Sequence, residues 1–337
     1  MRAGGVGCVY LVHGTFVGDD PAGLACALGR VSNALADGLR RATKSLVNRV
    51  VGDRGNFTRA YADELEQALN ATGVEPHIPV RVFDWSGANH HLARADAAVR
   101  LLDELLQHDA SPTSRVLLLG HSHGGNVFAL LSHLIAGESN DVAPFFKAAR
   151  CHYYSSLTRC CDLEAWERVS ERLASPERPV VNAPLDYITL GTPIRYGWSL
   201  RDGDRLLHFV HHRSSRTPPD HRASPPTSLA AFLNGEGGDY THQVGIAGSN
   251  IPPFPLFWRA FWADRCLNRL LQPHYSPLDL WRRLKHGLRV ADDGETLLYD
   301  YGGPEDRSLR SLTGHLHYTQ CKWLPFHADE IARRLYT

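Results

Sequence analysis

The chain has 337 residues, and its 36 lysines and arginines balance its 36 aspartates and glutamates. This balance excludes a global field that would draw the chain to nucleic acid or to an anionic bilayer. No apolar run approaches the roughly 20 residues that a membrane helix needs, so we expect no transmembrane segment.

Apolar and amphipathic segments alternate along the chain as a doubly wound sheet requires. Strands are expected at residues 6–12, 80–84, 115–119, 186–190, 205–211 and 295–301, and helices at 22–51, 58–69, 92–106, 126–136, 163–173 and 328–336. The alternation breaks up at about 138–184, where prolines interrupt it. We predict one α/β domain with a mostly parallel sheet and helices on both faces. It would carry a cap or lid at about 138–184 and a second irregular insertion at about 213–245.

Cysteine and histidine spacing gives no sign of a metal site. The seven cysteines include an adjacent pair, Cys160 and Cys161, but no Cys-x-x-Cys spacing, which argues against a disulfide framework and a zinc ribbon. Nineteen histidines are present, and none stands at a ligand spacing that also supplies a carboxylate. We interpret them as surface or rim residues and expect no metal. A metal site built from some of them is the less favoured alternative.

Only the first residues of the chain bear on its location in the cell. Residues 1–7 lack the long apolar core of a signal peptide, so a cytoplasmic protein is expected. A leader that had already been removed would leave no trace in this sequence.

Ser122 stands in the pentapeptide Gly-His-Ser-His-Gly, between an apolar strand and a helix. Gly-x-Ser-x-Gly in this position is typical of a nucleophile elbow, a strained turn that exposes a serine at the end of a strand. Glycines are needed because neighbouring backbone packs too closely for side chains there. The pattern predicts a catalytic serine, the alternative being a plain glycine-rich turn.

A second signal follows the first predicted strand, where the chain reads His13-Gly14-Thr15-Phe16. The carboxyl ends of parallel strands form one rim of a sheet. The loop after the first strand can therefore aim backbone N–H groups at the place where Ser122 reacts.

With His-Gly followed by Gly-x-Ser-x-Gly, the chain resembles the α/β-hydrolase superfamily over most of its length, and more closely its lipase and carboxylesterase branch. The resemblance implies that the N–H groups of Thr15 and His123 form the oxyanion hole. It also implies a triad in the chain order serine, acid, histidine. Gly191-Thr192-Pro193 resembles a trio found after the corresponding strand of lipase-like members.

The resemblance places the catalytic base after the last strand. His315 resembles that base because Gly314 precedes it and Tyr318 follows three residues later. His317 is the alternative, and whichever of the two is not the base would be a rim residue.

The triad acid is open to several candidates. Asp239, in a glycine-containing turn after the strand at 205–211, is the choice we favour. Asp300 is the main competitor, and Asp220 is another candidate in the same loop as Asp239. Relatives present the acid at a place that here reads Asn250, and an amide cannot stabilise a positive charge on the imidazole.

These residues predict a serine hydrolase that cleaves carboxylic esters through an acyl-enzyme on Ser122, without metal or organic cofactor. The expected partner is a small-molecule ester, acyl lipids included. A thioesterase, amidase, lactonase or phospholipase would use the same triad. A scaffold without catalytic activity that binds a ligand or a partner is the alternative of another class.

Substrate size is indicated by an aromatic stretch at residues 252–262. Such a stretch either lines an acyl pocket or covers the sheet as core. The core interpretation is the favoured one. Residues 84–89 follow a strand and are expected to shape the rim.

Overall fold

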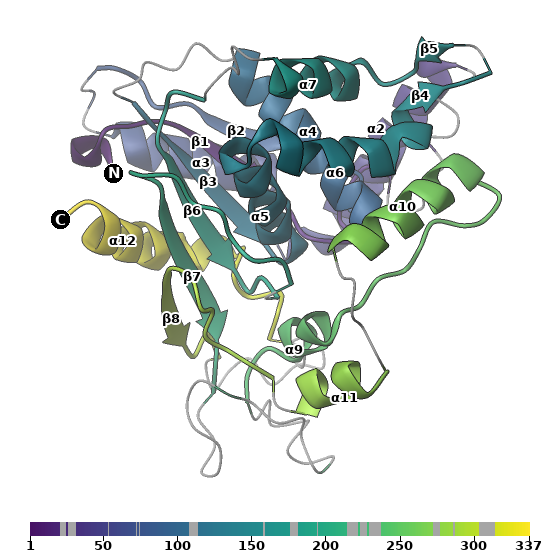
Figure 1. Cartoon of the computed structure of the whole chain (residues 1–337). Coiled ribbons are helices and arrows are strands. Elements are labelled where there is room, and N and C mark those ends of the chain that lie inside the picture. Colours follow the sequence, from purple (N-terminus) through teal and green to yellow (C-terminus); the bar gives the residue numbers. More distant parts are fainter. Residues whose placement is uncertain are drawn as a thin grey trace.

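Six parallel strands form the central sheet of the part of the chain that the structure describes (Figure 1). The structure is a computed structural model, and it describes residues 1–20, 25, 32–52, 54–71, 73, 75–107, 114–157, 159–175, 181–193, 195–213, 222, 228, 237–271, 277–285, 287–302 and 314–337. The strand order is β2-β1-β3-β6-β7-β8. The strands are β1 (Val6–Val12), β2 (Val80–Phe83), β3 (Arg115–His121), β6 (Leu185–Leu190), β7 (Arg205–His211) and β8 (Glu295–Tyr299).

Both faces of the sheet are covered by helices, which explains why its central strands are nearly continuous apolar runs. Successive side chains of a strand point to opposite faces. In β1, Tyr10 and Val12 therefore enter one core cluster, while Val9 and Leu11 enter the other.

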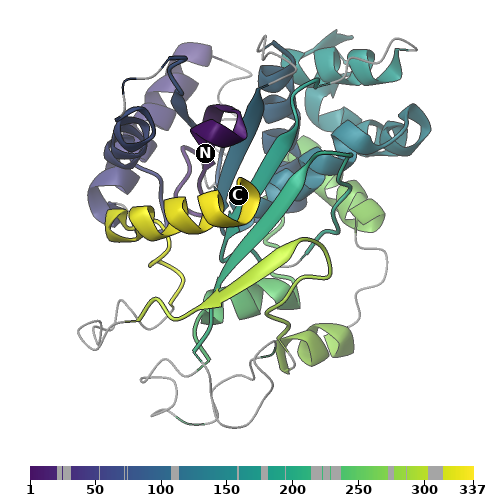
Figure 2. The same cartoon turned by 90° about the vertical axis from the view of Figure 1, so that its left-hand side faces the viewer.

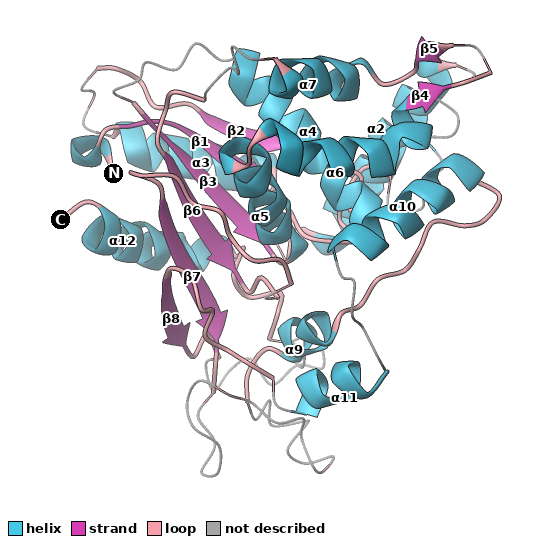
Figure 3. Cartoon of the chain, in the orientation of Figure 1, coloured by secondary structure: helices cyan, strands magenta, loops and turns pink. Residues whose placement is uncertain are grey.

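The helices divide into two layers (Figures 2 and 3). The first core cluster contains residues of α4 (His91–Gln107), α5 (His123–Ala136), α6 (Ser139–Tyr153), α7 (Glu164–Ala174) and α10 (Trp258–Leu271). The second contains residues of α3 (Arg59–Asn70) and α12 (Leu324–Leu335). Figure 2 shows α12, in yellow, lying across its face of the sheet. The remaining elements are η1 (Arg2–Gly4), α2 (Asn33–Val51), α9 (Tyr240–Ala247), α11 (Pro277–Lys285), η3 (Cys321–Trp323) and the antiparallel pair β4 (Tyr154–Ser155) and β5 (Cys160–Cys161).

The predicted α/β class with a mostly parallel sheet and flanking helices is confirmed. Within 138–184, where a cap or lid is predicted, the structure has α6, β4, β5 and α7. The buried Trp166 of α7 stacks on Phe145 of α6, and both belong to the first core cluster. Most of 213–245, Asp220 included, lies outside the described residues.

The aromatic stretch at 252–262 is not core, so the favoured prediction is wrong there. Phe254, Leu256, Trp258 and Trp262 keep 68%, 75%, 56% and 52% of their surface exposed. The reason is that α4, α5, α6 and α7 already cover that face of the sheet, and α10 packs outside α4 and α6. These aromatic side chains are therefore available to line a surface pocket.

The prediction that the histidines are surface or rim residues is also wrong for much of the set. Among the histidines that the structure describes, twelve are buried, namely His13, His91, His121, His123, His152, His208, His211, His212, His242, His315, His317 and His327. Many are held by hydrogen bonds that a sequence pattern does not reveal. His208, for example, lies 2.6 Å from the Thr189 hydroxyl, and His327 lies 2.8 Å from the Tyr301 hydroxyl.

We expect this set of buried histidines to make the fold acid-labile. Burial lowers the pKa of His13, His121, His242 and His327 to about 3. Below the ordinary histidine pKa of about 6.5, the unfolded chain binds protons that the native chain does not. Stability is therefore present above about pH 6.5 and is lost as the pH falls, by up to about 1.4 kcal/mol per pH unit for each such histidine.

Urea unfolding at a series of pH values between 7.5 and 5 measures this loss. His327→Gln should make the slope of unfolding free energy against pH shallower by about one histidine's contribution. A wild-type slope that is flat over this range would contradict the expectation.

Candidate active site

The turn from β3 into α5 holds Ser122 in a strained backbone conformation. Its φ of 53° and ψ of −128° lie outside the regions that L residues favour, at a cost of about 1 to 3 kcal/mol. Two hydrogen bonds, to residues at and just after the end of β6, hold the turn. The Ser122 N–H donates to the Leu190 carbonyl at 2.9 Å, and the Thr192 hydroxyl donates to the Ser122 carbonyl at 2.8 Å.

Two glycines allow three chain segments to meet around this serine. A Cβ on Gly124 would collide with the carbonyl groups of Val12 and His13 at the end of β1. A Cβ on Gly14 would lie only 2.7 Å from the Cβ of Ser122. The loop after β1 and the start of α5 therefore approach Ser122 as closely as backbone permits.

The two predicted oxyanion donors, Thr15 and His123, lie on these two segments. His123 is the first residue of α5, so its N–H belongs to the set that a helix leaves without an intrahelical acceptor. The partial positive charge of a helix N-terminus adds to its attraction for an anion.

His13 controls the direction of the other donor. Its Nδ1 donates to the Gly14 carbonyl at 2.9 Å, and Trp85 Nε1 donates to the His13 carbonyl at 2.8 Å. In a trans peptide, N–H and C=O point in opposite directions. Fixing the Gly14 carbonyl therefore also fixes the N–H of Thr15.

Asp239 and His315, which come from loops after β7 and β8, are in direct contact. His315 Nδ1 donates to Asp239 Oδ2 at 2.6 Å, and both side chains are buried. The other carboxylate oxygen accepts the His242 N–H at 2.8 Å, because Asp239 is also the N-cap of α9. The cap holds the carboxylate in the orientation that reaches the imidazole.

Asp239 is ionised in this site. Burial on its own would raise the pKa of the carboxyl group, but positive charge and hydrogen bonds from His315, together with the His242 N–H, hold that pKa well below its usual range. The carboxylate can therefore stabilise a positive charge that forms on the imidazole of His315.

His121, which directly precedes Ser122, contacts His315. Its Nε2 donates to the His315 carbonyl at 2.9 Å, and the two ring centroids are 4.7 Å apart. Burial lowers the pKa of His121 to about 3, so it stays neutral and adds no competing charge. The sequence contains no indication of this contact beyond the position of His121 in the pentapeptide.

The second ring nitrogen of His315 is the one not engaged by Asp239. Its Nε2 is buried and makes no hydrogen bond within the described part of the chain. Ser122 Oγ and His315 Nε2 are not hydrogen-bonded to each other in this structure. Such contacts are often long in unliganded enzymes and tighten when substrate binds.

The other candidates for the acid and the base contact different residues. Asp300 pairs with Arg213 at 3.0 Å, and the ring of His317 lies 6.2 Å from that of His211. Asn250 accepts from Arg94 at 3.2 Å. The structure thus brings Asp239, and not Asn250, to the imidazole of His315.

Searches against known proteins find no relative of this chain. No protein-family model, no curated protein and no solved structure matches it. The function must therefore be inferred from the site.

Within the described residues, no group of three or more histidine, cysteine, aspartate or glutamate side chains is arranged to hold a metal ion. No helix in that part of the chain is long and apolar enough to cross a membrane.

Tyr318 is a second residue whose contact with the site the sequence did not predict. Its hydroxyl donates to Asp239 Oδ2 at 3.0 Å and accepts the His211 N–H at 2.7 Å. Burial raises its pKa well above 10, so the phenol stays protonated and remains a donor. Tyr318 therefore shares with His315 a single carboxylate oxygen.

Tyr318→Phe should strengthen the basicity of His315, because the whole charge of Asp239 Oδ2 then faces the imidazole. If the site is catalytic, we expect the acidic limb of the kcat/KM profile to move to higher pH. We also expect kcat to fall by roughly tenfold with little change in KM, since the carboxylate is less well held. Both are read from pH-rate profiles.

Tyr301→Phe is the matched control, because Tyr301 is equally buried and packs edge-to-face against Tyr318, with ring centroids 4.8 Å apart, but hydrogen-bonds to His327. It should lower stability without moving the acidic limb. Equal shifts in the two variants would show that Tyr318 acts only through packing.

Proposed function

We propose that this chain is a serine hydrolase of the α/β-hydrolase superfamily that cleaves carboxylic esters. The observation that carries the proposal is the buried Asp239–His315 pair, 2.6 Å apart, in contact with His121, which directly precedes a serine held on a strained turn. Ser122, Asp239 and His315 also follow the chain order that this superfamily uses.

The position of the site in the sheet supports the same proposal. The chain runs from β1 to β2 on one side and then returns to β3 on the other side of β1. Ligands of open α/β sheets bind outside the carboxyl ends of the strands at such a reversal. Thr15 follows β1 and Ser122 follows β3, so both lie at this point.

The proposed reaction begins when Ser122 Oγ attacks the ester carbonyl carbon and its proton passes to His315 Nε2. The carbonyl oxygen becomes an oxyanion that accepts hydrogen bonds from the N–H groups of Thr15 and His123. When the tetrahedral intermediate collapses, the C–O bond to the alcohol breaks and the imidazolium returns its proton to the alcohol. Water then attacks the acyl-enzyme with His315 as base, releasing the acid and restoring the serine.

A fluorophosphonate probe tests the proposal, because it labels a serine only when the serine is activated. Mass spectrometry should locate the adduct on Ser122, and the protein should hydrolyse p-nitrophenyl butyrate. Ser122→Ala should abolish the label, whereas Ser175→Ala, at the end of α7, should keep it.

A protein that neither takes the label nor hydrolyses the ester would instead be a scaffold without catalytic activity. Hydrolysis of p-nitrophenyl esters alone does not distinguish an esterase from a thioesterase or an amidase, so rates with matched thioesters and amides of butyric acid complete the test.

A further inference from the structure

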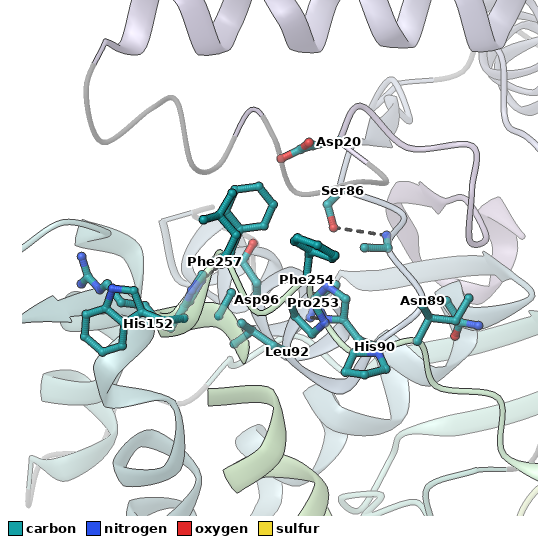
Figure 4. A pocket seen from close by; sticks show the side chains of 18 of the residues that line it. Asp20, Ser86, Asn89, His90, Leu92, Asp96, His152, Pro253, Phe254 and Phe257 are labelled. Carbon is teal, nitrogen blue, oxygen red and sulfur yellow. Dashed lines mark hydrogen bonds and ion pairs between the residues drawn. The ribbon is translucent and has the colours of Figure 1, made fainter. Parts of the chain in front are cut away.

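A pocket of about 480 Å³ lies beside the candidate site, between the aromatic stretch and the start of α4 (Figure 4). Its described lining comes from four parts of the chain: the loop after β2 with the first turns of α4, the segment from Ile251 to Ala260, the residues Phe16 and Asp20, and His152 near the end of α6. None of Ser122, Asp239 and His315 lines it, so it is not the place of the reaction.

One residue of the pocket lining is nevertheless the sequence neighbour of a predicted oxyanion donor. Phe16 lines it and directly follows Thr15. The Phe16 N–H donates to the Gly87 carbonyl at 2.8 Å, and the Ile251 N–H donates to the Asn89 carbonyl at 2.6 Å. Both walls are thus attached to the loop after β2, which fixes the pocket relative to the Thr15 N–H.

The lining favours an uncharged hydrocarbon chain. It is rich in large apolar side chains, of which Leu92 is buried and Phe257 partly buried, whereas the exposed ones are Phe16, Ile251, Phe254, Leu256 and Trp258. Figure 4 shows Phe254 and Phe257 close to Leu92 and Pro253. Covering such exposed apolar surface is favourable.

The charged groups in the lining argue against an anionic ligand. Asp20 and Asp96 are the carboxylates, Arg259 already forms an ion pair with Asp162, and His152 lies 4.0 Å from Asp96. Burial, aided by the charge of Arg94, lowers the pKa of His90 to about 3, so this histidine is neutral. A phosphate or a free carboxylate would find no uncompensated cation among these groups.

We propose that this pocket holds the acyl chain of the substrate and that the enzyme prefers esters of medium-length fatty acids, with about eight carbons, over acetate. The inference rests on the proposed function. The leaving alcohol must lie near His315 Nε2, which protonates it, and none of the described residues of that loop lines the pocket. The acyl group is bound on the side of Thr15, where the pocket begins.

The test is a series of p-nitrophenyl esters from acetate to decanoate. Full burial of each methylene is worth up to about fourfold in kcat/KM, so octanoate should exceed acetate by well over tenfold. The increase should stop when the pocket is filled.

Trp258 and Trp262 provide a matched pair of variants, since they lie one turn apart on α10 and are exposed to a similar degree. Trp258 lines the pocket, whereas Trp262 does not. Trp258→Ala should lower the octanoate-to-acetate ratio of kcat/KM by about tenfold. Trp262→Ala should leave the ratio as it is.

The outcomes separate this inference from the proposed function. Labelling of Ser122 and hydrolysis of acetate with no preference for acyl length would overturn the pocket assignment alone. So would a preference that follows the alcohol chain in a series of alkyl acetates, or equal effects of the two tryptophan variants. Absence of both label and hydrolysis would overturn the proposed function and this inference with it.

Discussion

Ser122→Ala is expected to reduce ester hydrolysis by about a millionfold, to the rate that binding and the oxyanion donors alone can sustain. The loss is this large because the triad acts as a unit. Without the Oγ nucleophile, neither the His315 base nor the Asp239 carboxylate has a bond to form or a proton to move. Single-turnover kinetics with p-nitrophenyl octanoate measure the residual rate.

The backbone of the serine gives this experiment an internal control. Alanine keeps the strain of a φ of 53°, whereas glycine relieves it. Ser122→Gly should therefore be as inactive as Ser122→Ala but more stable by about 1 kcal/mol in urea unfolding. If Ser122→Ala keeps more than a few per cent of wild-type turnover, Ser122 is not the nucleophile.

Asp239→Asn should cost about ten-thousandfold in kcat. Asparagine is as good an N-cap as aspartate, so α9 and its bond from the His242 N–H should persist. What is lost is the charge that stabilises the imidazolium of His315, together with the acceptor that fixes the imidazole tautomer. The chemical step should therefore slow while KM changes little.

Asp300→Asn is the companion variant because it removes a carboxylate that pairs with Arg213 and is exposed to solvent. Its turnover should stay near that of the wild type. An inactive Asp300→Asn beside a fully active Asp239→Asn would transfer the role of the acid to Asp300. Circular dichroism of both proteins excludes unfolding as the cause.

The strands and the serine turn could be predicted because their signals are local. The apolar run at 115–119 and the glycines around Ser122 are adjacent in sequence, and β3 and α5 follow from them. The helix predicted at 58–69 is present at Arg59–Asn70 because Thr58 caps it. Local propensity and tertiary structure agree at these places.

The acid and its supports could not be resolved because they depend on contacts between distant residues. Asp239 is positioned by the guanidinium of Arg289, which donates to its carbonyl at 2.8 Å and to that of Gly237 at the same distance. Nothing in the sequence indicates that Arg289 and Asp239 are in contact. The sequence therefore favours Asp239 without excluding Asp300 or Asp220.

Four of the described helices, α6, α9, α10 and α11, are not among the predicted ones, and for two of them the reason lies in their own residues. α6 contains Pro144, which reads as a breaker, and α9 is only eight residues long. The exposure of the aromatic stretch was missed because aromatic residues are abundant in both cores and pockets. Whether such a stretch belongs to the core or to a pocket depends on whether other helices already cover the sheet, as they do here.

The groups that would make and break bonds and the groups that would hold the hydrocarbon chain belong to different parts of the polypeptide. Ser122, Asp239 and His315 follow strands of the sheet, whereas Phe254 and Trp258 belong to a stretch outside the helical layer. Mutations in that stretch can therefore accumulate without disturbing the core that supports the chemistry. A library confined to residues 251–260 should yield variants with altered acyl-length selectivity whose reactivity toward a fluorophosphonate is unchanged.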